Sequence, residues 1–547
     1  MSKRTAEELA NIAKRYKKLN PREHVVQRPD MYVGPTRPKR CEGYMPNLKT
    51  FQFTRDVYHM APALGKIADE VIVNAYDNIN RPSTKKNKRQ PTRNIRISYT
   101  DEGRVTVRND GTTIPVAMHE RQNMYVPTMV FGHMRTGENY DDKQKRYGGG
   151  RNGFGAKLCN IFSSEFTVRC VDSTNGQEFN QTWTDGMQTT TGPRVTKTTN
   201  KNDYTEISFV PDWKQFKMDK MNRAFAKYIT KRALEVAACS PKDVKVYLND
   251  VQLPVNNLGD YVALYTKETI TYVKLSKYWE VAIFPHDGTG DPISMPSFVN
   301  GICTSRGGEH VKHAMQPVLR YLAQQASKKV KGIKVRSNDV KTFVNAFVNA
   351  LIVNPEFESQ TKEMLTSDEK DFGSKCDWKD NKLKKFNRSG VLEKVEAWAI
   401  AKAGQKLQQK VKSKSRLNVP KLYDANQAGR NQILSAACSI LLTEGDSALT
   451  TALSGLEVVG RSKWGAFPLK GKLLNVRDAS AKQLLENSEV QNVCKILGLV
   501  PFQPPNPAQQ RYGHVVIMAD QDHDGSHIKG LVINLSLIHI SEPTRPY

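Results

Sequence analysis

The sequence contains no long hydrophobic run. No stretch approaches the roughly 18 to 20 consecutive apolar residues that a membrane-spanning helix needs. The most apolar segment, residues 343–353, is interrupted by Asn345 and Asn349. The first residues, MSKRTAEELANIAKRYKK, are charged throughout and contain no apolar signal core. We therefore expect neither a membrane partner nor a secretory leader.

Cysteine is scarce as well. The 547 residues include eight cysteines, the closest pair is Cys159 and Cys170, and no CxxC motif occurs. This spacing argues against a zinc ribbon and against a disulfide scaffold. It favours a reducing, intracellular compartment.

Acidic residues are outnumbered by basic ones. There are 82 Lys and Arg residues against 55 Asp and Glu residues, which leaves a formal charge of +27. An excess of this size predicts a polyanionic partner such as nucleic acid. With 38% apolar and 25% charged residues, the composition is globular and excludes a wholly disordered chain.

The length predicts several domains, because one domain takes about 150 residues. Apolar residues at helical spacing predict a helix over residues 62–78, and alternating residues predict strands at 95–99 and 105–107. The other expected elements are a hairpin over 166–183 that turns at Asn175-Gly176, a basic helical stretch over 315–341, connectors at 375–390 and 404–420, and a final compact α/β domain.

The helix over residues 62–78 carries four polar side chains on one face. Glu70, Asn74, Asp77 and Asn78 stand at positions i, i+4, i+7 and i+8. A carboxylate and a carboxamide one turn apart can activate a water molecule and bind Mg²⁺ through oxygen. Taken alone, the pattern is more typical of a solvated helix face.

A glycine-rich loop follows further along the chain. Residues 148–158 read GGGRNGFGAKL and continue into helix-like sequence. Glycines let backbone N–H groups approach an anion, and a helix N-terminus adds partial positive charge. The loop is not a Walker motif, because no GKS or GKT follows, and a purely structural loop is the alternative. Between the two elements lies NDGTTIP, residues 109–115.

In their order and spacing, these three elements resemble the ATP-binding boxes of the gyrase, chaperone, histidine-kinase and MutL superfamily. Residues 66–78 (KIADEVIVNAYDN), 124–127 (MYVP) and 149–162 (GGRNGFGAKLCNIF) also resemble type II DNA topoisomerases of the eukaryotic and viral kind. The resemblance extends to Asn534. It implies a multidomain α/β protein with a GHKL-type ATPase sandwich, a transducer domain like domain 2 of ribosomal protein S5, and an incomplete Rossmann-like TOPRIM domain.

The resemblance also implies roles for single residues. Glu70 would be the general base for the attacking water, Asn74 the ligand of the ATP-bound Mg²⁺, and Asn109 the contact to adenine. Asn139 would lie near the ribose, where Glu138 departs from the serine that is usual in the family. The remaining ATP-binding residues implied are Asp77, Asn78, Gly149, Gly150, Arg151, Asn152, Gly153, Phe154, Gly155, Ala156 and Lys157.

Residues 354–363, NPEFESQTKE, follow the family's QTK loop. Lys362 is a flexible cation that can meet a γ-phosphate as a point charge, and Gln360 accompanies it in the ATP site that the resemblance implies. Upstream, Lys328, Lys329 and Lys331 form a basic cluster. This cluster is either a solvated face or a contact to DNA held by the protein.

Acidic residues end two apolar strands near the end of the chain. Glu444 ends the first strand, and Asp520, Asp522 and Asp524 alternate after the second. Alternation lets such carboxylates converge on a hard cation. A calcium-binding EF-hand loop is excluded, because its twelfth position is Leu531 rather than Glu. An acidic surface turn stays open.

Together these acids resemble a TOPRIM site. The resemblance would give Glu444 and Asp520 to one Mg²⁺, and Asp522 and Asp524 to a second position. Such a site stabilises the charge that develops as a phosphodiester breaks and reseals. The segment between them, residues 467–480, resembles the family's DNA-gate segment, in which Lys470, Lys472 and Arg477 would neutralise phosphates.

Beyond Asn534 the sequence LSLIHISEPTRPY, residues 535–547, resembles a translated sequencing-library adapter. We expect it to lie outside the native fold, and Tyr547 has no claim to be the cleavage tyrosine. The expected division is an ATPase domain with an N-terminal arm at 1–249, a transducer at 250–390, a basic linker at 391–430 and TOPRIM at 431–534.

The sequence thus predicts the N-terminal part of an ATP-dependent, homodimeric type II DNA topoisomerase that uses ATP and Mg²⁺ on double-stranded DNA. We expect ATP hydrolysis and DNA binding without DNA cleavage, in the nucleus if the source is eukaryotic and in the host cell if it is viral. Two alternatives stay open: an ATP-gated DNA clamp without strand passage, and a binding-only protein with a degenerate ATPase.

Overall fold

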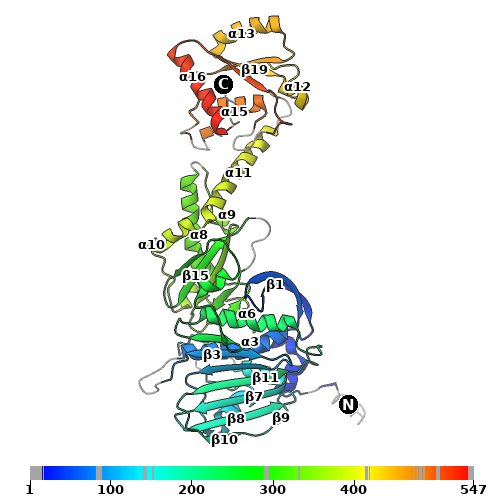
Figure 1. Cartoon of the computed structure of the whole chain (residues 1–547), viewed down its shortest axis with the longest axis vertical. Helices are drawn as coiled ribbons and strands as arrows, with labels where there is room; N and C mark the ends of the chain where they lie inside the picture. Colours follow the sequence, from blue (N-terminus) through cyan, green and yellow to red (C-terminus); the bar gives the residue numbers. More distant parts are fainter. Residues whose placement is uncertain are drawn as a thin grey trace, which may run out of the picture. The chain divides into compact units, whose positions relative to one another are not determined.

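Figure 1 shows a computed structural model of the chain. It describes residues 15–539 apart from 17, 82–88, 139–143, 151–152, 289–294, 331–332, 413–416, 418, 472, 477–478, 480–482, 485–486 and 500–505. Residues 403–412 and 536–539 are described by their backbone alone. The chain divides into two compact units, the first made of residues 1–318 and 344–389, the second of 319–343 and 390–547.

A nine-stranded sheet makes up much of the first unit. Its order is β10-β8-β7-β11-β4-β3-β12-β13, with β9 paired to β8. The strands are β3 (Asn94–Tyr99), β4 (Val105–Asp110), β7 (Ser163–Asp172), β8 (Gln177–Thr184), β9 (Thr189–Thr190), β10 (Arg194–Lys197), β11 (Tyr204–Pro211), β12 (Lys245–Leu248) and β13 (Val251–Gln252). Both predicted hairpins are confirmed: Ile97 pairs with Val107, and Val171 pairs with Glu178.

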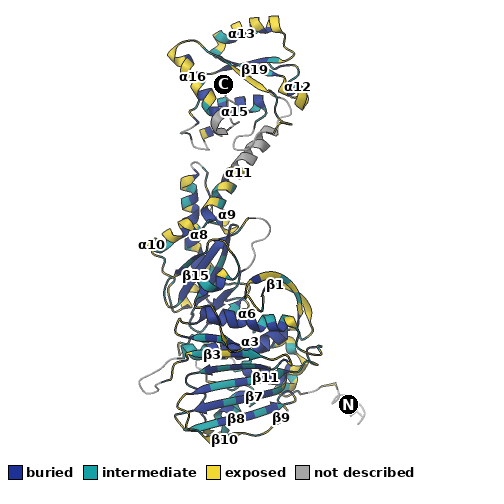
Figure 2. Ribbon diagram, in the orientation of Figure 1, coloured by how far each residue is buried: buried dark blue, intermediate teal, exposed yellow. Residues whose placement is uncertain are grey.

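The predicted helix over residues 62–78 is confirmed as α3 (Pro62–Asp77). Proline at its first turn suits a helix start, because that N–H would have no helical partner. The helix packs against α5 (Gly155–Ile161), α6 (Arg223–Cys239) and strands β3, β4 and β11. It is buried along most of its length, as the dark blue ribbon in Figure 2 shows. The functional helix is therefore a core element.

A second, five-stranded sheet completes the first unit. Its order is β14-β15-β18-β16-β17, and its strands are β14 (Thr271–Lys274), β15 (Trp279–Pro285), β16 (Ser297–Val299), β17 (Ile302–Thr304) and β18 (Val344–Ala350). One hydrophobic core joins the two sheets, since it contains Leu64 and Phe166 as well as Phe298 and Phe347.

Shorter elements surround these sheets. They are α2 (Pro21–Gln27), β1 (Lys39–Pro46), β2 (Phe53–Met60), β5 (Met118–His119), β6 (Met124–Tyr125), α4 (Val126–Gly132), α7 (Leu258–Ala263) and α10 (Asp380–Leu383).

The basic helical stretch predicted over 315–341 is confirmed for most of its length but is interrupted. The chain forms α8 (Glu309–Lys329) and, after a break, α9 (Ser337–Lys341). Within the break, Ser327 Oγ accepts the backbone N–H of Val335 at 3.0 Å, so the chain returns to the last turn of α8. The expected linker begins with α11 (Val391–Lys412). No described helix combines the length and apolar character needed to cross a membrane.

The second unit is built on a parallel sheet with the order β20-β19-β21. The strands are β19 (Ser439–Glu444), β20 (Trp464–Leu469) and β21 (His514–Met518), and the helices around them are α12 (Gln432–Ala436), α13 (Gly445–Val459), α15 (Ser488–Leu497) and α16 (His523–His539). The core of this unit includes Leu535, so α16 continues past Asn534. That residues 535–547 are foreign to the native sequence stays a prediction.

Candidate functional site

A cavity of about 950 Å³ opens in the first unit, between α3, the glycine loop and residues 355–366. Every ATP-binding residue predicted from the sequence and described by the structure lines it: Glu70, Asn74, Asp77, Asn78, Asn109, Gly149, Gly150, Gly153, Phe154, Gly155, Ala156, Lys157, Gln360 and Lys362. Asn139, Arg151 and Asn152 lie outside the described residues. The volume suits a nucleotide-sized ligand.

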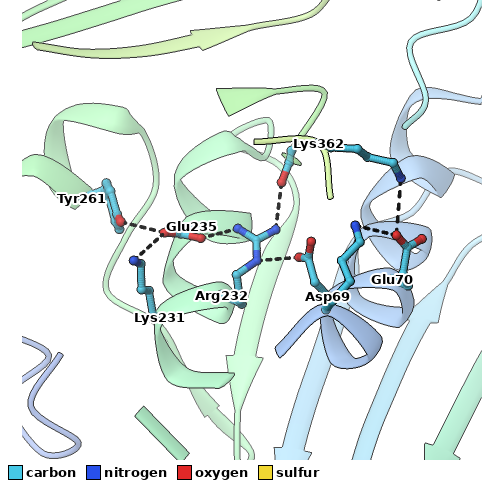
Figure 3. Close-up of polar contacts among 9 residues, drawn as sticks. Asp69, Glu70, Lys231, Arg232, Glu235, Tyr261 and Lys362 are labelled. Atoms are coloured by element: carbon cyan, nitrogen blue, oxygen red, sulfur yellow. Dashed lines mark hydrogen bonds and ion pairs between the residues drawn. The ribbon is translucent and has the colours of Figure 1, made fainter. Parts of the chain in front are cut away.

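Glu70 is held between two lysines (Figure 3). Its Oε1 lies 2.6 Å from Nζ of Lys66 and 3.5 Å from Nζ of Lys362. Burial by itself raises the pKa of Glu70, but Lys362 and Lys66 outweigh burial and lower it to about 2. The side chain is therefore a carboxylate at neutral pH, as a proton acceptor must be.

The glycine loop passes directly over this carboxylate. A Cβ atom at Gly155 would lie 2.2 Å from Oε2 of Glu70, so a residue with a side chain would collide there. Gly155 also begins α5, and the residues of its first turn line the cavity. Backbone N–H groups in the first turn of a helix have no helical partner. The glycine is required by the close approach of the loop to the Glu70 carboxylate.

Asp77 is hydrogen-bonded to the start of the glycine loop. Its carboxylate accepts the backbone N–H of Gly149 at 3.0 Å and that of Gly150 at 3.2 Å. Burial raises the pKa of Asp77 to about 6, although these N–H donors and the nearby Lys362 favour the charged form. The loop is thus attached to α3 by a group that titrates close to neutral pH.

This titration gives a pH-dependence that can be measured. Because the pKa of Asp77 is raised to about 6, lowering the pH through that value neutralises the carboxylate and weakens its bonds to the loop. We expect kcat/KM for ATP to fall as the pH drops through about 6. The variant Asp77→Asn should lack this acid limb. A wild-type profile that stays flat across pH 6, or an unchanged limb in the variant, would contradict the assignment.

The predicted asparagines of the site differ in their contacts and in their exposure. Asn78 donates to Oγ1 of Thr92 at 3.0 Å and to the backbone carbonyl of Asp110 at 3.4 Å, and Asn109 donates to the same carbonyl at 3.1 Å, so both amides are bound to the end of β4. Asn74 is exposed toward the cavity one turn beyond Glu70. Carboxamide and carboxylate oxygens at this spacing are donors that suit Mg²⁺.

Two lysines, Lys157 and Lys362, also line the cavity. Lys157 is buried and donates from Nζ to the carbonyl of Thr136 at 2.6 Å. Lys362 lies at the end of a tight turn closed by its N–H to the carbonyl of Ser359 at 3.0 Å. Its φ of 61° is uncommon for a lysine. Such backbone strain is found where a side chain must be aimed at a functional position.

Sequence reasoning missed two features of this site. Lys66 was not singled out, although it stands four residues before Glu70 on the same helix face. A buried ionic cluster around Arg232, which contacts Asp69, was also missed. The departure at Glu138 has a partner, because Arg81 forms an ion pair with it at 2.9 Å.

The predicted acidic site of the second unit is brought together in part. Parallel pairing of Thr443 with Met518 places the ends of β19 and β21 side by side, and the N–H of Asp520 donates to Oε2 of Glu444 at 3.2 Å. Asp522 accepts the N–H of Gly525 at 2.7 Å in the first turn of α16. Within the described residues no group of three or more His, Cys, Asp or Glu side chains could hold a metal ion. Metal binding by Glu444, Asp520, Asp522 and Asp524 stays a prediction.

The basic residues proposed for DNA are described only in part. Lys328 and Lys470 are exposed, and Lys329 forms an ion pair with Glu396 at 2.9 Å. Lys331, Lys472 and Arg477 lie outside the described residues. The cluster therefore has exposed charge, which suits a solvated face and a phosphate contact alike.

Two family models match this chain. Residues 61–199 match the histidine kinase-, DNA gyrase B- and HSP90-like ATPase, and residues 244–415 match DNA gyrase B. Among curated proteins, DNA topoisomerase 2 of Drosophila melanogaster is 42% identical over 97% of this chain and 37% of its own length. That of Pisum sativum is 40% identical over 96% of this chain and 36% of its own length. The chain spans little more than a third of these relatives.

Solved structures of two topoisomerase II ATPase regions resemble the fold. The ATPase and transducer domains from Balamuthia mandrillaris are 36% identical, with a TM-score of 0.66, and 74% of this chain covers 100% of that one. The ATPase region from Saccharomyces cerevisiae is 34% identical, with a TM-score of 0.63, and 71% of this chain covers 99% of that one.

Proposed function

Because the chain belongs to the type II DNA topoisomerase family, we propose that its first unit hydrolyses ATP and that this hydrolysis drives the passage of one DNA duplex through another. The observation that carries the proposal is the convergence of the Glu70 carboxylate, Lys157, Lys362 and the glycine loop in one cavity. These groups suit a reaction in which a water molecule attacks a phosphate.

Glu70 is the general base of this reaction. It accepts a proton from the water that attacks the γ-phosphorus, the bond from phosphorus to the bridging oxygen breaks, and ADP leaves with the electron pair. The backbone N–H groups of the glycine loop stabilise the charge on the phosphate oxygens. A Mg²⁺ ion held by Asn74 would neutralise part of the triphosphate charge.

Lys362 links catalysis to the nucleotide. Its ammonium group lies 3.5 Å from Oε1 of Glu70, and this pairing contributes to the low pKa of the carboxylate. A γ-phosphate is a more highly charged partner for Lys362. When Lys362 turns to it, the pKa of Glu70 rises and the carboxylate becomes a stronger base. The base is thus activated by the substrate that it acts on.

DNA and a second copy of the chain are the partners of the proposed reaction. The formal charge of +27 and the exposed Lys328 and Lys470 support contacts to phosphates. Glu444 and Asp520, which lie together at the ends of parallel strands, are proposed to hold the Mg²⁺ that assists strand cleavage in the complete enzyme.

The strand-passage part of the proposal is tested in the complete enzyme that carries this sequence. The variant Asp520→Ala should abolish relaxation of supercoiled DNA, because the metal that stabilises the breaking phosphodiester loses a ligand. Its ATP turnover should stay close to that of the wild type. The exposed Asp446 on α13, changed to Ala, is the matched control. Undiminished relaxation by Asp520→Ala would contradict the metal assignment.

A further inference from the structure

A two-residue turn of the second sheet reaches into the ATPase core. Asn300 and Gly301 connect β16 to β17, with Val299 paired to Ile302 across the hairpin. Their φ angles are 51° and 75°, and an Asn-Gly pair is favoured where both central residues of a hairpin need positive φ. Residues 300–302 are called the coupling turn below.

Asn300 fixes the coupling turn to the segment that leads to Lys362. Its side chain is fully buried, donates to the carbonyl of Ile352 at 2.8 Å and accepts the N–H of the same residue at 2.8 Å. Its own N–H donates to the carbonyl of Ala350, the last residue of β18, at 2.9 Å. The turn and the start of the Lys362 loop are therefore one hydrogen-bonded element.

Arg232 joins this turn to the helix that carries the base (Figure 3). The guanidinium group is 2% exposed, donates to Oδ1 of Asp69 at 2.6 Å and to the carbonyl of Gly301 at 3.1 Å, and also bonds Glu235. Asp69 directly precedes Glu70 on α3. A rigid planar guanidinium can hold three acceptors at fixed angles, which a lysine cannot.

The other side of the turn supports the glycine loop. A Cβ atom at Gly149 would lie 2.5 Å from Cδ1 of Ile302, so the backbone of the loop rests directly on this buried side chain. Gly149 is also the residue whose N–H is held by Asp77. A shorter side chain at position 302 would remove this contact with the glycine loop.

We infer that Arg232 is a positioning residue for hydrolysis. Through two separate contacts, the coupling turn holds Glu70 and the glycine loop at fixed positions relative to each other. Arg232 fixes α3 beside Glu70, and Ile302 fixes the loop at Gly149. The inference rests on the proposed ATP hydrolysis. It assigns to the second sheet a hold on the helix that carries the base, through Arg232 and Asp69, in addition to the Lys362 loop.

The two contacts predict two different kinetic defects. Arg232→Lys keeps the buried positive charge but cannot reach Asp69, Glu235 and Gly301 together, so kcat should fall about ten- to a hundredfold with KM for ATP unchanged. Ile302→Val removes the methyl group that faces Gly149, so KM for ATP should rise severalfold while kcat stays within about twofold. Steady-state ATP turnover and the stoichiometry of a bound non-hydrolysable analogue are measured for both.

The stoichiometry separates positioning from a merely structural role. If Arg232→Lys binds one analogue per chain, as the wild type does, its lower kcat belongs to the folded protein. Lys227→Ala is the control, because Lys227 lies on the same helix and pairs with Asp56 at 2.5 Å, away from the turn. It should keep wild-type kcat and KM.

Two results would overturn the inference. The first is wild-type kcat and KM in both Arg232→Lys and Ile302→Val. The second is an equal loss of kcat and of analogue stoichiometry in Arg232→Lys. If Arg232→Lys does not fold, Ile302→Val decides alone, and an unchanged KM refutes the role of the turn. Absence of turnover in the wild type would instead refute the proposed function, so the two failures are distinguishable.

Discussion

Replacing Glu70 by glutamine should abolish ATP hydrolysis and leave nucleotide binding in place. The glutamine keeps the shape of the side chain between Lys66 and Lys362 but cannot accept the proton of the attacking water. Loss of a general base typically costs about 10²- to 10⁴-fold in rate. We expect a fall of this size in kcat, measured as phosphate release, with analogue affinity within a few-fold of the wild type.

A matched control separates this effect from a general loss of charge. Glu42 on β1 is exposed and pairs with Arg55 at 2.8 Å, so Glu42→Gln should retain full turnover. A thermal melt checks that the Glu70 variant is folded, because glutamine leaves the buried Lys66 without its closest anion. Equal loss of binding and hydrolysis in a folded Glu70→Gln protein would refute the assignment of Glu70 as the base.

Replacing Lys362 by methionine should lower kcat about 10²- to 10³-fold, the cost typical of removing one donor to a developing charge. Its ammonium group is buried in the cavity, 3.5 Å from Glu70. Methionine fills the same space without the charge that we propose for the γ-phosphate. Although the carboxylate of Glu70 becomes more basic without Lys362, the phosphate loses its cation, so the net effect is a loss.

The control for this variant comes from the same segment. Lys370 is exposed and pairs only with the neighbouring Asp368 among the ion pairs of the described residues. Lys370→Met should therefore turn over ATP like the wild type. Wild-type kcat in Lys362→Met would show that the lysine does not meet the nucleotide and that its ion pair with Glu70 is structural.

Local patterns were sufficient to predict the elements that carry the site. The helical spacing from Leu64 to Val71 predicted α3. The glycines of residues 148–155 predicted a loop at the site, and the structure adds a close approach of Gly155 to Glu70 that was not foreseen. Both signals lie within a few residues of sequence. The cavity then brought together side chains that resemblance alone had grouped, including Lys362 from a segment 292 residues after Glu70.

What the sequence did not reveal depends on long-range pairing. Arg232 contacts Asp69 across 163 residues and Gly301 across 69 residues, and no periodicity links these positions. From the sequence alone, a charged residue such as Arg232 within a helix predicts a solvent-exposed position, whereas the fold buries it. The break after α8 was missed too, and the contact that returns the chain to α8, from the N–H of Val335 to Ser327 Oγ, spans eight residues.

For the acidic residues of the second unit, the sequence pattern was recognised but its role was not determined by it. Alternating aspartates after a strand predict convergence of their carboxylates, whereas the contact that the structure shows is from the backbone N–H of Asp520 to Glu444. Asp522 uses one oxygen to accept the N–H of Gly525 in the first turn of α16, as acidic residues commonly do at a helix N-terminus. The same pattern can therefore hold a metal or cap a helix, and spacing alone does not distinguish the two.

The central claim is that this chain hydrolyses ATP at Glu70, and phosphate release by the purified 547-residue protein tests it most directly. Measured with saturating ATP, with Mg²⁺ and then with Mg²⁺ removed by a chelator, turnover should be present in the first case and lost in the second. A protein that binds ATP stoichiometrically in Mg²⁺ yet releases no phosphate would contradict the claim and identify a binding-only protein.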